Sequence, residues 1–125
     1  MTKILASIKN VHEAEIISKF NFDIVDIKNV KDGALGYVGD SSIEKIIKIF
    51  NNNKLSVTAG NDSSPLTKNQ SKRIEFLDQL GIEYVKIGIF DTNLLQDHYN
   101  LLKSVKHLTI KTVGVIFADL IDSEQ

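Results

Sequence analysis

The 125-residue chain contains no cysteine, so disulfides, thiol nucleophiles and thiolate metal sites are excluded. Arginine is almost absent, since Arg73 is the only one, and the net charge is −1. Because its acidic and basic residues are almost equal in number, the chain lacks the broad basic surface that binding to nucleic acid or to an anionic membrane requires. No apolar run is long enough for a signal peptide or a membrane span. We therefore expect a cytoplasmic protein with no nucleic-acid partner and no membrane partner.

Metal and cofactor signals are also missing. The three histidines, His12, His98 and His107, fall on or beside expected helices and show no metal-ligand spacing. The glycine-bearing stretch "KDGALGYVGD" lacks the spacings of the dinucleotide-binding and P-loop motifs. We read it as a turn that needs positive φ angles, although it could also approach a ligand. The expectation is therefore no metal and no cofactor.

What the chain does contain is a regular alternation of short apolar segments and amphipathic ones. Its length and its 42% hydrophobic content suit one globular domain over residues 1–125. The short segments predict strands, and the segments between them predict helices. The strands are expected at 3–9, 23–28, 55–59, 82–90 and 111–117. This βα alternation predicts parallel strands with right-handed crossovers. Both an open doubly wound sheet and part of a (β/α)8 barrel fit it.

Several local signals support the helices. The clearest is an apolar face with helical spacing at Ile43, Ile46, Ile47 and Phe50. Ser41 and Glu44 have the spacing of a capping box that would begin this helix. Asn10 is the expected N-cap of the first helix, and Gly81 is the expected terminator of the third.

Two lysines stand in apolar strand segments, Lys28 in "DIVDIKN" and Lys86 in "EYVKIG". We place both near the carboxyl ends of their strands, where parallel α/β folds carry their active sites. Apolar surroundings disfavour an ammonium group, and a free amine can attack a carbonyl to form a Schiff base. Asp26 shares a strand face with Lys28, so it could orient that lysine or shuttle a proton. The plainer alternative is that each lysine only marks a strand leaving the core.

The segments "DIVDIKNVKDGALG", "SVTAGN", "YVKIGIF" and "VGVIFAD" resemble, in this order and spacing, the (5-formylfuran-3-yl)methyl phosphate synthase family. The resemblance implies a (β/α)8 TIM-barrel fold, represented here by about five βα strands. It also implies a class I aldolase-like lyase of methanofuran biosynthesis. Such an enzyme condenses two molecules of glyceraldehyde 3-phosphate, a small phosphorylated aldehyde, to a furan aldehyde phosphate.

The same resemblance implies roles for individual residues. It makes Lys28 the Schiff-base lysine, Asp26 its partner, Lys86 the second lysine, and Asp119 the aspartate after strand five. The chain departs from the family pattern at Val30, where proline is frequent, and at Ser123, where a basic residue is expected.

Five strands are fewer than a closed barrel needs. Three arrangements stay open: a fragment, a homo-oligomer or other pairing that closes the barrel, and a shortened relative. The last would be a non-catalytic half-barrel that binds a phosphorylated ligand or a partner chain.

Overall fold

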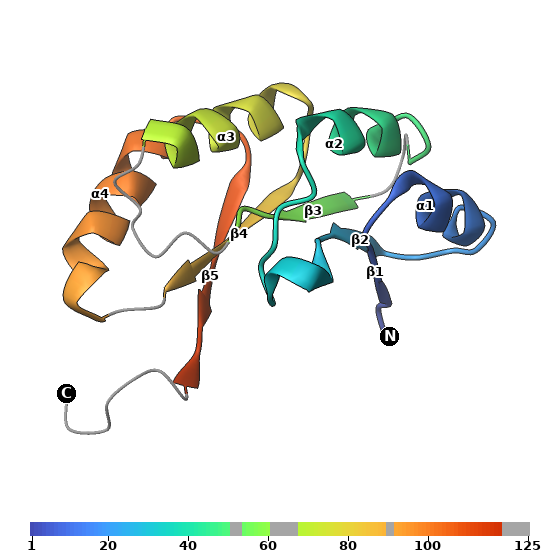
Figure 1. Cartoon of the computed structure of the whole chain (residues 1–125), viewed down its shortest axis with the longest axis horizontal. Coiled ribbons are helices and arrows are strands. Elements are labelled where there is room, and N and C mark those ends of the chain that lie inside the picture. Colours follow the sequence, from blue (N-terminus) through green and yellow to red (C-terminus); the bar gives the residue numbers. More distant parts are fainter. Residues whose placement is uncertain (51–53, 61–67, 90–91, 119–125) are drawn as a thin grey trace.

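A computed structural model describes residues 1–50, 54–60, 68–89 and 92–118. Strands and helices alternate along them, as the sequence predicts (Figure 1). The strands are β1 (Leu5–Ile8), β2 (Ile24–Ile27), β3 (Lys54–Thr58), β4 (Tyr84–Ile89) and β5 (Lys111–Ile116). The helices are α1 (Val11–Ile17), α2 (Asp40–Ile47), α3 (Lys68–Gln79) and α4 (Leu95–Val105), with short 3-10 turns η1 (Val30–Asp32) and η2 (Thr92–Leu94).

The five strands form one sheet in the order β1-β2-β3-β4-β5, and every neighbouring pair is parallel. Helices α1 to α4 lie in an arc along one side of this sheet (Figure 1). A doubly wound sheet would instead reverse its strand order at a switch point and carry helices on both faces. Sequential order with helices on one side is the arrangement of consecutive βα units in a barrel. The chain thus has an α/β fold compatible with a partial (β/α)8 barrel.

The hydrophobic core lies between the sheet and the helices. Alternate strand residues point into it because strand side chains alternate between faces. Val25, Ile27, Val57 and Val85 are fully buried there. The helices contribute Ala14, Ile43, Ile46, Ile74 and Leu77, which are also fully buried. This layer holds the central strands in place and leaves the other sheet face free of helices.

Three helix-end signals have different outcomes. The Asn10 side chain accepts the Glu13 N–H at 2.8 Å and caps α1, which confirms that prediction. Gly81 follows α3 with a φ of 81°, as a terminating glycine should. The capping box of Ser41 and Glu44 is wrong. Helix α2 begins earlier, at Asp40, and no side chain caps its first turn. Gly39, with a φ of 99°, turns the chain into the helix, so Ser41 is already helical.

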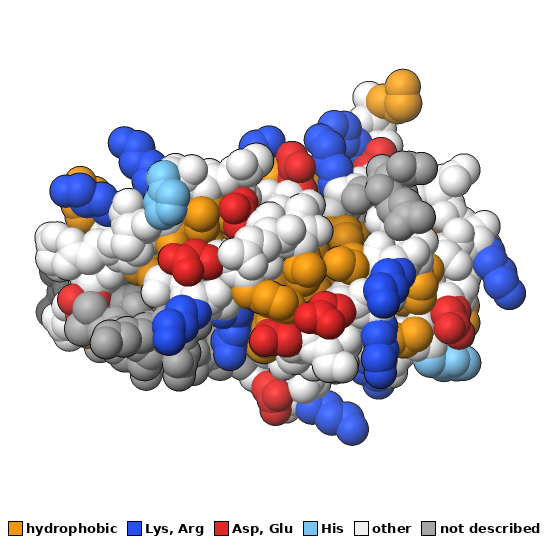
Figure 2. Space-filling model, turned by 90° about the horizontal axis from the view of Figure 1, so that it is seen from above, with side chains coloured by type: hydrophobic (Ala, Val, Ile, Leu, Met, Phe, Trp, Pro, Cys, Tyr) orange, Lys and Arg blue, Asp and Glu red, His pale blue; other side chains and the backbone are white. Residues whose placement is uncertain are grey.

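The outer surface over the helices carries charges of both signs. Figure 2, seen from above Figure 1, shows acidic and basic side chains interspersed around a central group of hydrophobic ones. Among the described residues, every helix is too short or too polar to cross a membrane.

Candidate active site

The polar residues of interest lie on the sheet face that the helices leave uncovered. Ser7, Asp26, Ser56 and Tyr84 are register partners on four neighbouring strands. Register partners in a parallel sheet share a face, and the residues before and after each of them point to the helices. The fully buried valines at positions 25, 57 and 85 take those helix-facing places. One row of side chains therefore crosses the open face from β1 to β4.

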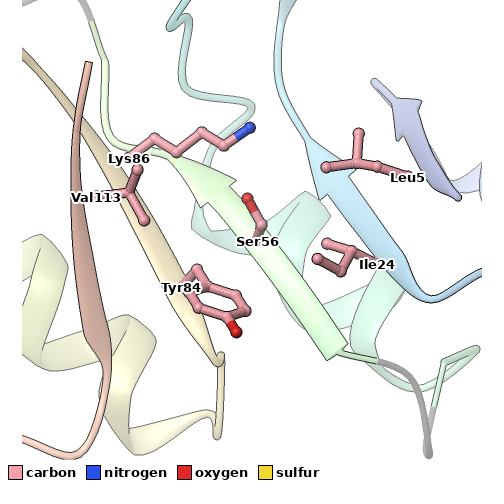
Figure 3. A pocket seen from close by; sticks show the side chains of 6 residues that line it. All are labelled: Leu5, Ile24, Ser56, Tyr84, Lys86 and Val113. Atoms are coloured by element: carbon pink, nitrogen blue, oxygen red, sulfur yellow. The ribbon is translucent and has the colours of Figure 1, made fainter. Parts of the chain in front are cut away.

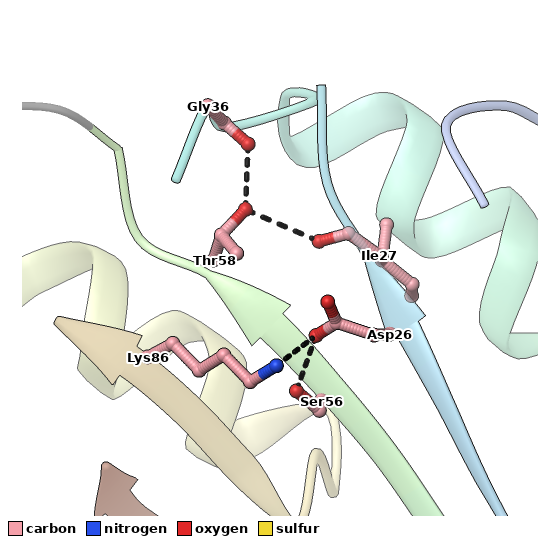
Figure 4. A network of polar contacts seen from close by, with 6 residues as sticks. All are labelled: Asp26, Ile27, Gly36, Ser56, Thr58 and Lys86. Atoms are coloured by element: carbon pink, nitrogen blue, oxygen red, sulfur yellow. Dashed lines mark hydrogen bonds and ion pairs between the residues drawn. The ribbon is translucent and has the colours of Figure 1, made fainter. Parts of the chain in front are cut away.

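An ion pair with a hydroxyl partner forms the centre of this row (Figure 4). The Lys86 Nζ lies 3.2 Å from Asp26 Oδ1, and the Ser56 hydroxyl donates to the same oxygen at 2.5 Å. Asp26 is only 2% exposed, whereas the Lys86 side chain is 25% exposed. Hydrogen bonds to a carboxylate are short and strong, and they offset part of the cost of removing this charge from water. The lysine thus covers a carboxylate that would otherwise face the open side of the sheet.

Lys28 and Lys86 lie at the same level of the sheet. Lys86 on β4 is the register partner of Thr58 on β3. On β2, Ile27 is the register partner of Val57, so the next residue, Lys28, is level with Thr58. The two lysines are two strands apart, about 10 Å between backbones at the usual strand spacing. Lys86 is the third of six residues in β4, so it is not near the end of its own strand as expected. It is level with the end of β3 because β4 extends further.

The partner of Asp26 also differs from the expectation. Sequence alternation suggested that Asp26 would act on Lys28, and the structure pairs it with Lys86 instead. Lys28 is half-buried and forms no ion pair in the part of the chain that the structure describes. It lines a cavity of about 120 Å³ together with Ser7, Lys9 and Glu13. The two lysines are therefore in different electrostatic states, one paired and one not.

A second cavity, of about 160 Å³, opens on the same sheet face beside Lys86 (Figure 3). The surface that its lining exposes is apolar, and the lining residues are Leu5, Ile24, Ser56, Tyr84, Lys86 and Val113. Ser56 and Tyr84 were not singled out from the sequence. Side-chain alternation in "LSVTA" is the signal that puts Ser56 on one face with Thr58, but only the strand register shows that this face also carries Asp26.

The glycine loop after β2 folds back onto the end of β3. The Gly36 carbonyl accepts the Thr58 hydroxyl at 2.6 Å and the Asn29 N–H at 2.9 Å. A Cβ on Gly36 would lie 2.1 Å from the Asn29 carbonyl oxygen, so no larger residue fits there without backbone movement. Gly33 has a φ of 94°, which supports the interpretation of the loop as a turn. The loop thereby fixes the chain directly after Lys28.

A second contact ties this loop to β3. The Arg73 guanidinium of α3 lies 4.0 Å from the centre of the Tyr37 ring and donates to the Ala59 carbonyl. The Tyr37 hydroxyl donates to Asp40. Burial raises the pKa of Tyr37 well above its usual range, and the Asp40 carboxylate raises it further, so the phenol keeps its proton. Arg73 therefore stabilises the rim of the site.

The remaining candidates are placed as follows. Asp119 lies outside the described residues. His12 and His107 are exposed. His98 is buried on α4, and neither of its ring nitrogens has a hydrogen-bond partner in the part of the chain that the structure describes. Burial lowers the pKa of His98, while the charge of Asp97 opposes this shift. Among the described residues, no three His, Asp or Glu side chains form a group that could hold a metal ion.

Comparison with known proteins identifies one family. A family model described as 4-HFC-P synthase matches residues 4–125, which include all five strands and the row of polar side chains. A search of curated proteins gives no match.

Proposed function

Because the chain belongs to the 4-HFC-P synthase family, we propose that it carries out the Schiff-base condensation that gives the furan aldehyde phosphate. The family name denotes a synthase of methanofuran biosynthesis. The proposed substrate is glyceraldehyde 3-phosphate, of which two molecules condense with loss of phosphate and water. In this proposal the enzyme is a lyase of the class I aldolase type, and its reaction needs no metal and no cofactor.

The observation that supports this reaction most is the contrast between the two lysines. A lysine attacks a carbonyl only as the uncharged amine. A carboxylate beside an amine stabilises its charged form, and Asp26 provides such a carboxylate to Lys86 alone. Lys28, which has no ion pair among the described residues, is therefore the better nucleophile. We assign the imine to Lys28.

The Lys86–Asp26 pair has a different role in the proposal. Its ammonium lies on the open face, at the same level as Lys28 and beside the 160 Å³ cavity. A fixed positive charge there would stabilise negative charge that develops on a substrate oxygen or phosphate. Asp26 holds Lys86 in place and, with Asp119, is proposed to take part in the proton transfers of the eliminations.

Borohydride trapping tests this assignment. The protein is incubated with glyceraldehyde 3-phosphate, reduced with borohydride and analysed by peptide mass spectrometry. We expect a stable adduct on Lys28, none in Lys28→Arg, and an unchanged adduct in the control Lys31→Arg, an exposed lysine three residues away. An unlabelled wild-type protein, or a label that persists in Lys28→Arg, would contradict the proposed chemistry.

A second function is a non-catalytic module that binds a phosphorylated ligand or a partner chain, including a second copy that closes the barrel. The observation that favours it is the apolar lining of the open face, where Leu5 and Val113 are 47% and 37% exposed. Such a module would bind glyceraldehyde 3-phosphate in calorimetry or form dimers in sedimentation, yet give no adduct on Lys28. The trapping experiment therefore separates the two functions.

A further inference from the structure

Glu13 lines the same cavity as Lys28. It is the third residue of α1 and follows β1 closely, so it belongs to the rim where the strands end. Its backbone is fixed, because its N–H donates to the Asn10 side chain at 2.8 Å. The cavity measures about 120 Å³ and is lined by Ser7, Ile8, Lys9, Glu13, Lys28 and Val30. It is therefore large enough for a few water molecules or the reacting end of a small aldehyde.

The Glu13 carboxylate is incompletely satisfied. Its Oε2 is shielded from solvent and has no hydrogen-bond partner among the described residues. In a capping box, a glutamate at this position would bond back to the first residue of the cap, but Oε2 makes no such bond. A buried carboxylate oxygen without a donor is costly, and such groups in native proteins often have a functional role. Neither Lys9 nor Lys28 forms an ion pair with it in the described part of the chain.

We propose that Glu13 is the proton-transfer residue for imine formation on Lys28. This inference rests on the proposed function, because it assigns a further residue to the same reaction. No sequence motif indicated Glu13; the shared cavity and the unpartnered oxygen do. Asp26 of β2, the other acidic candidate, is engaged by Lys86 and Ser56. Glu13 is the acidic residue that lines the Lys28 cavity.

The proton balance of the step shows why a carboxylate is needed. Lys28 and Glu13 are not within ion-pair distance of each other, so the transfers pass through a water molecule in the cavity. The Lys28 ammonium gives one proton by this route to Glu13, and the lysine nitrogen then attacks the aldehyde carbon. An N–C bond forms, and the π pair of the carbonyl moves to its oxygen. The substrate oxygen then receives the first proton from Glu13, and the lysine nitrogen releases a second proton to the same carboxylate. That proton goes to the hydroxyl, the C–O bond breaks, water leaves, and the protonated imine remains. Glu13 ends the step as it began.

The test is the rate of imine formation, measured by quenching the protein and glyceraldehyde 3-phosphate with borohydride at successive times. Removing a general acid–base group costs about 100-fold or more in rate. We therefore expect Glu13→Gln to form the Lys28 adduct about 100-fold more slowly. The matched control is Glu15→Gln, on an exposed glutamate of the same helix, which should keep the wild-type rate.

A second variant separates proton transfer from packing. Glu13→Ala leaves space that a small carboxylate can enter, so added formate should accelerate adduct formation in this variant and not in the wild type. Adduct formation by Glu13→Gln at the wild-type rate would overturn the role of Glu13 while the proposed function stands. A slow Glu13→Ala variant that formate does not accelerate would make Glu13 a packing residue and also overturn it. An unlabelled wild-type protein would overturn both proposals.

Discussion

The buried ion pair allows a quantitative prediction in which the two partners behave differently. Replacing Lys86 with methionine keeps most of the side-chain volume but removes the charge that faces Asp26. The carboxylate would then be 2% exposed with Ser56 as its remaining partner. Breaking a buried pair costs about 3–5 kcal/mol. Since the lysine side chain is 25% exposed and water can reach this face, we expect about 2–3 kcal/mol for Lys86→Met.

Replacing the other partner of the pair, Asp26, should lower the stability less. In Asp26→Asn the amide oxygen still accepts the Ser56 hydroxyl, and the partly exposed ammonium of Lys86 can turn to solvent. The expected loss is about 1 kcal/mol, the usual net value of one hydrogen bond. The double variant leaves no unpaired charge, so it should also lose only about 1 kcal/mol. The coupling energy of the cycle would then be about 2–3 kcal/mol.

Urea unfolding at pH 7 measures all four proteins of this cycle. Lys111→Met provides the control, because Lys111 pairs with Glu83 at 3.0 Å but its side chain is 63% exposed. Exposed pairs contribute little, so this variant should unfold close to the wild type. The reasoning is refuted if Lys86→Met is no less stable than Asp26→Asn, or if the two effects add within about 0.5 kcal/mol.

Three further predictions concern the rim and the core. Gly36→Ala should destabilise the fold by about 3 kcal/mol or more, because the new Cβ would meet the Asn29 carbonyl oxygen at 2.1 Å. Gly39→Ala has open space but a φ of 99°, so thermal unfolding should show a smaller loss of about 1–2 kcal/mol. Thr58→Val should cost about 1–2 kcal/mol in urea unfolding, because the Gly36 carbonyl loses its buried hydroxyl donor. His98 should make stability fall as the pH drops below about 6.5: burial lowers its pKa in the folded state, so the unfolded chain takes up the proton first. The free energy of unfolding would change by at most about 1.4 kcal/mol per pH unit from this one group. His98→Leu should remove this pH dependence when unfolding is measured between pH 7 and pH 5.

Each of these outcomes has a clear contrary result. Gly36→Ala as mild as Gly39→Ala would mean that the loop moves freely away from Asn29. Thr58→Val as stable as Thr58→Ser would show that the hydroxyl is dispensable. An unchanged pH slope in His98→Leu, with His12→Gln as the exposed-histidine control, would show that His98 is not the group that titrates.

Much of the local structure could be predicted from the sequence. The alternation of strands and helices, the Asn10 cap, the Gly81 terminator and the buried face of Ile43 and Ile46 all depend on neighbours within a few residues. The predicted capping box at Ser41 is wrong because of the local backbone conformation. Gly39 takes a backbone conformation that begins the helix earlier, and the sequence pattern does not reveal a φ angle.

The candidate site was predicted only in part. Alternation placed Asp26 and Lys28 on one strand face, and it therefore suggested that Asp26 would act on Lys28. The structure brings Lys86 across β3 to Asp26. Glu13 and Ser56 carried no signal of their own, because a glutamate in a first helical turn and a serine in a strand are ordinary.

By itself, the sequence determined which segments are strands or helices and which side chains share a face, because both follow from short-range periodicity. It left open whether the sheet is doubly wound or barrel-like. The tertiary structure decided the sequential strand order and the register that places Asp26, Ser56 and Tyr84 in one row. These depend on the packing of residues far apart in the chain, such as β2 against β3 and β4. Spacing along the sequence cannot specify which strands become neighbours, and it therefore could not show which lysine Asp26 would hold.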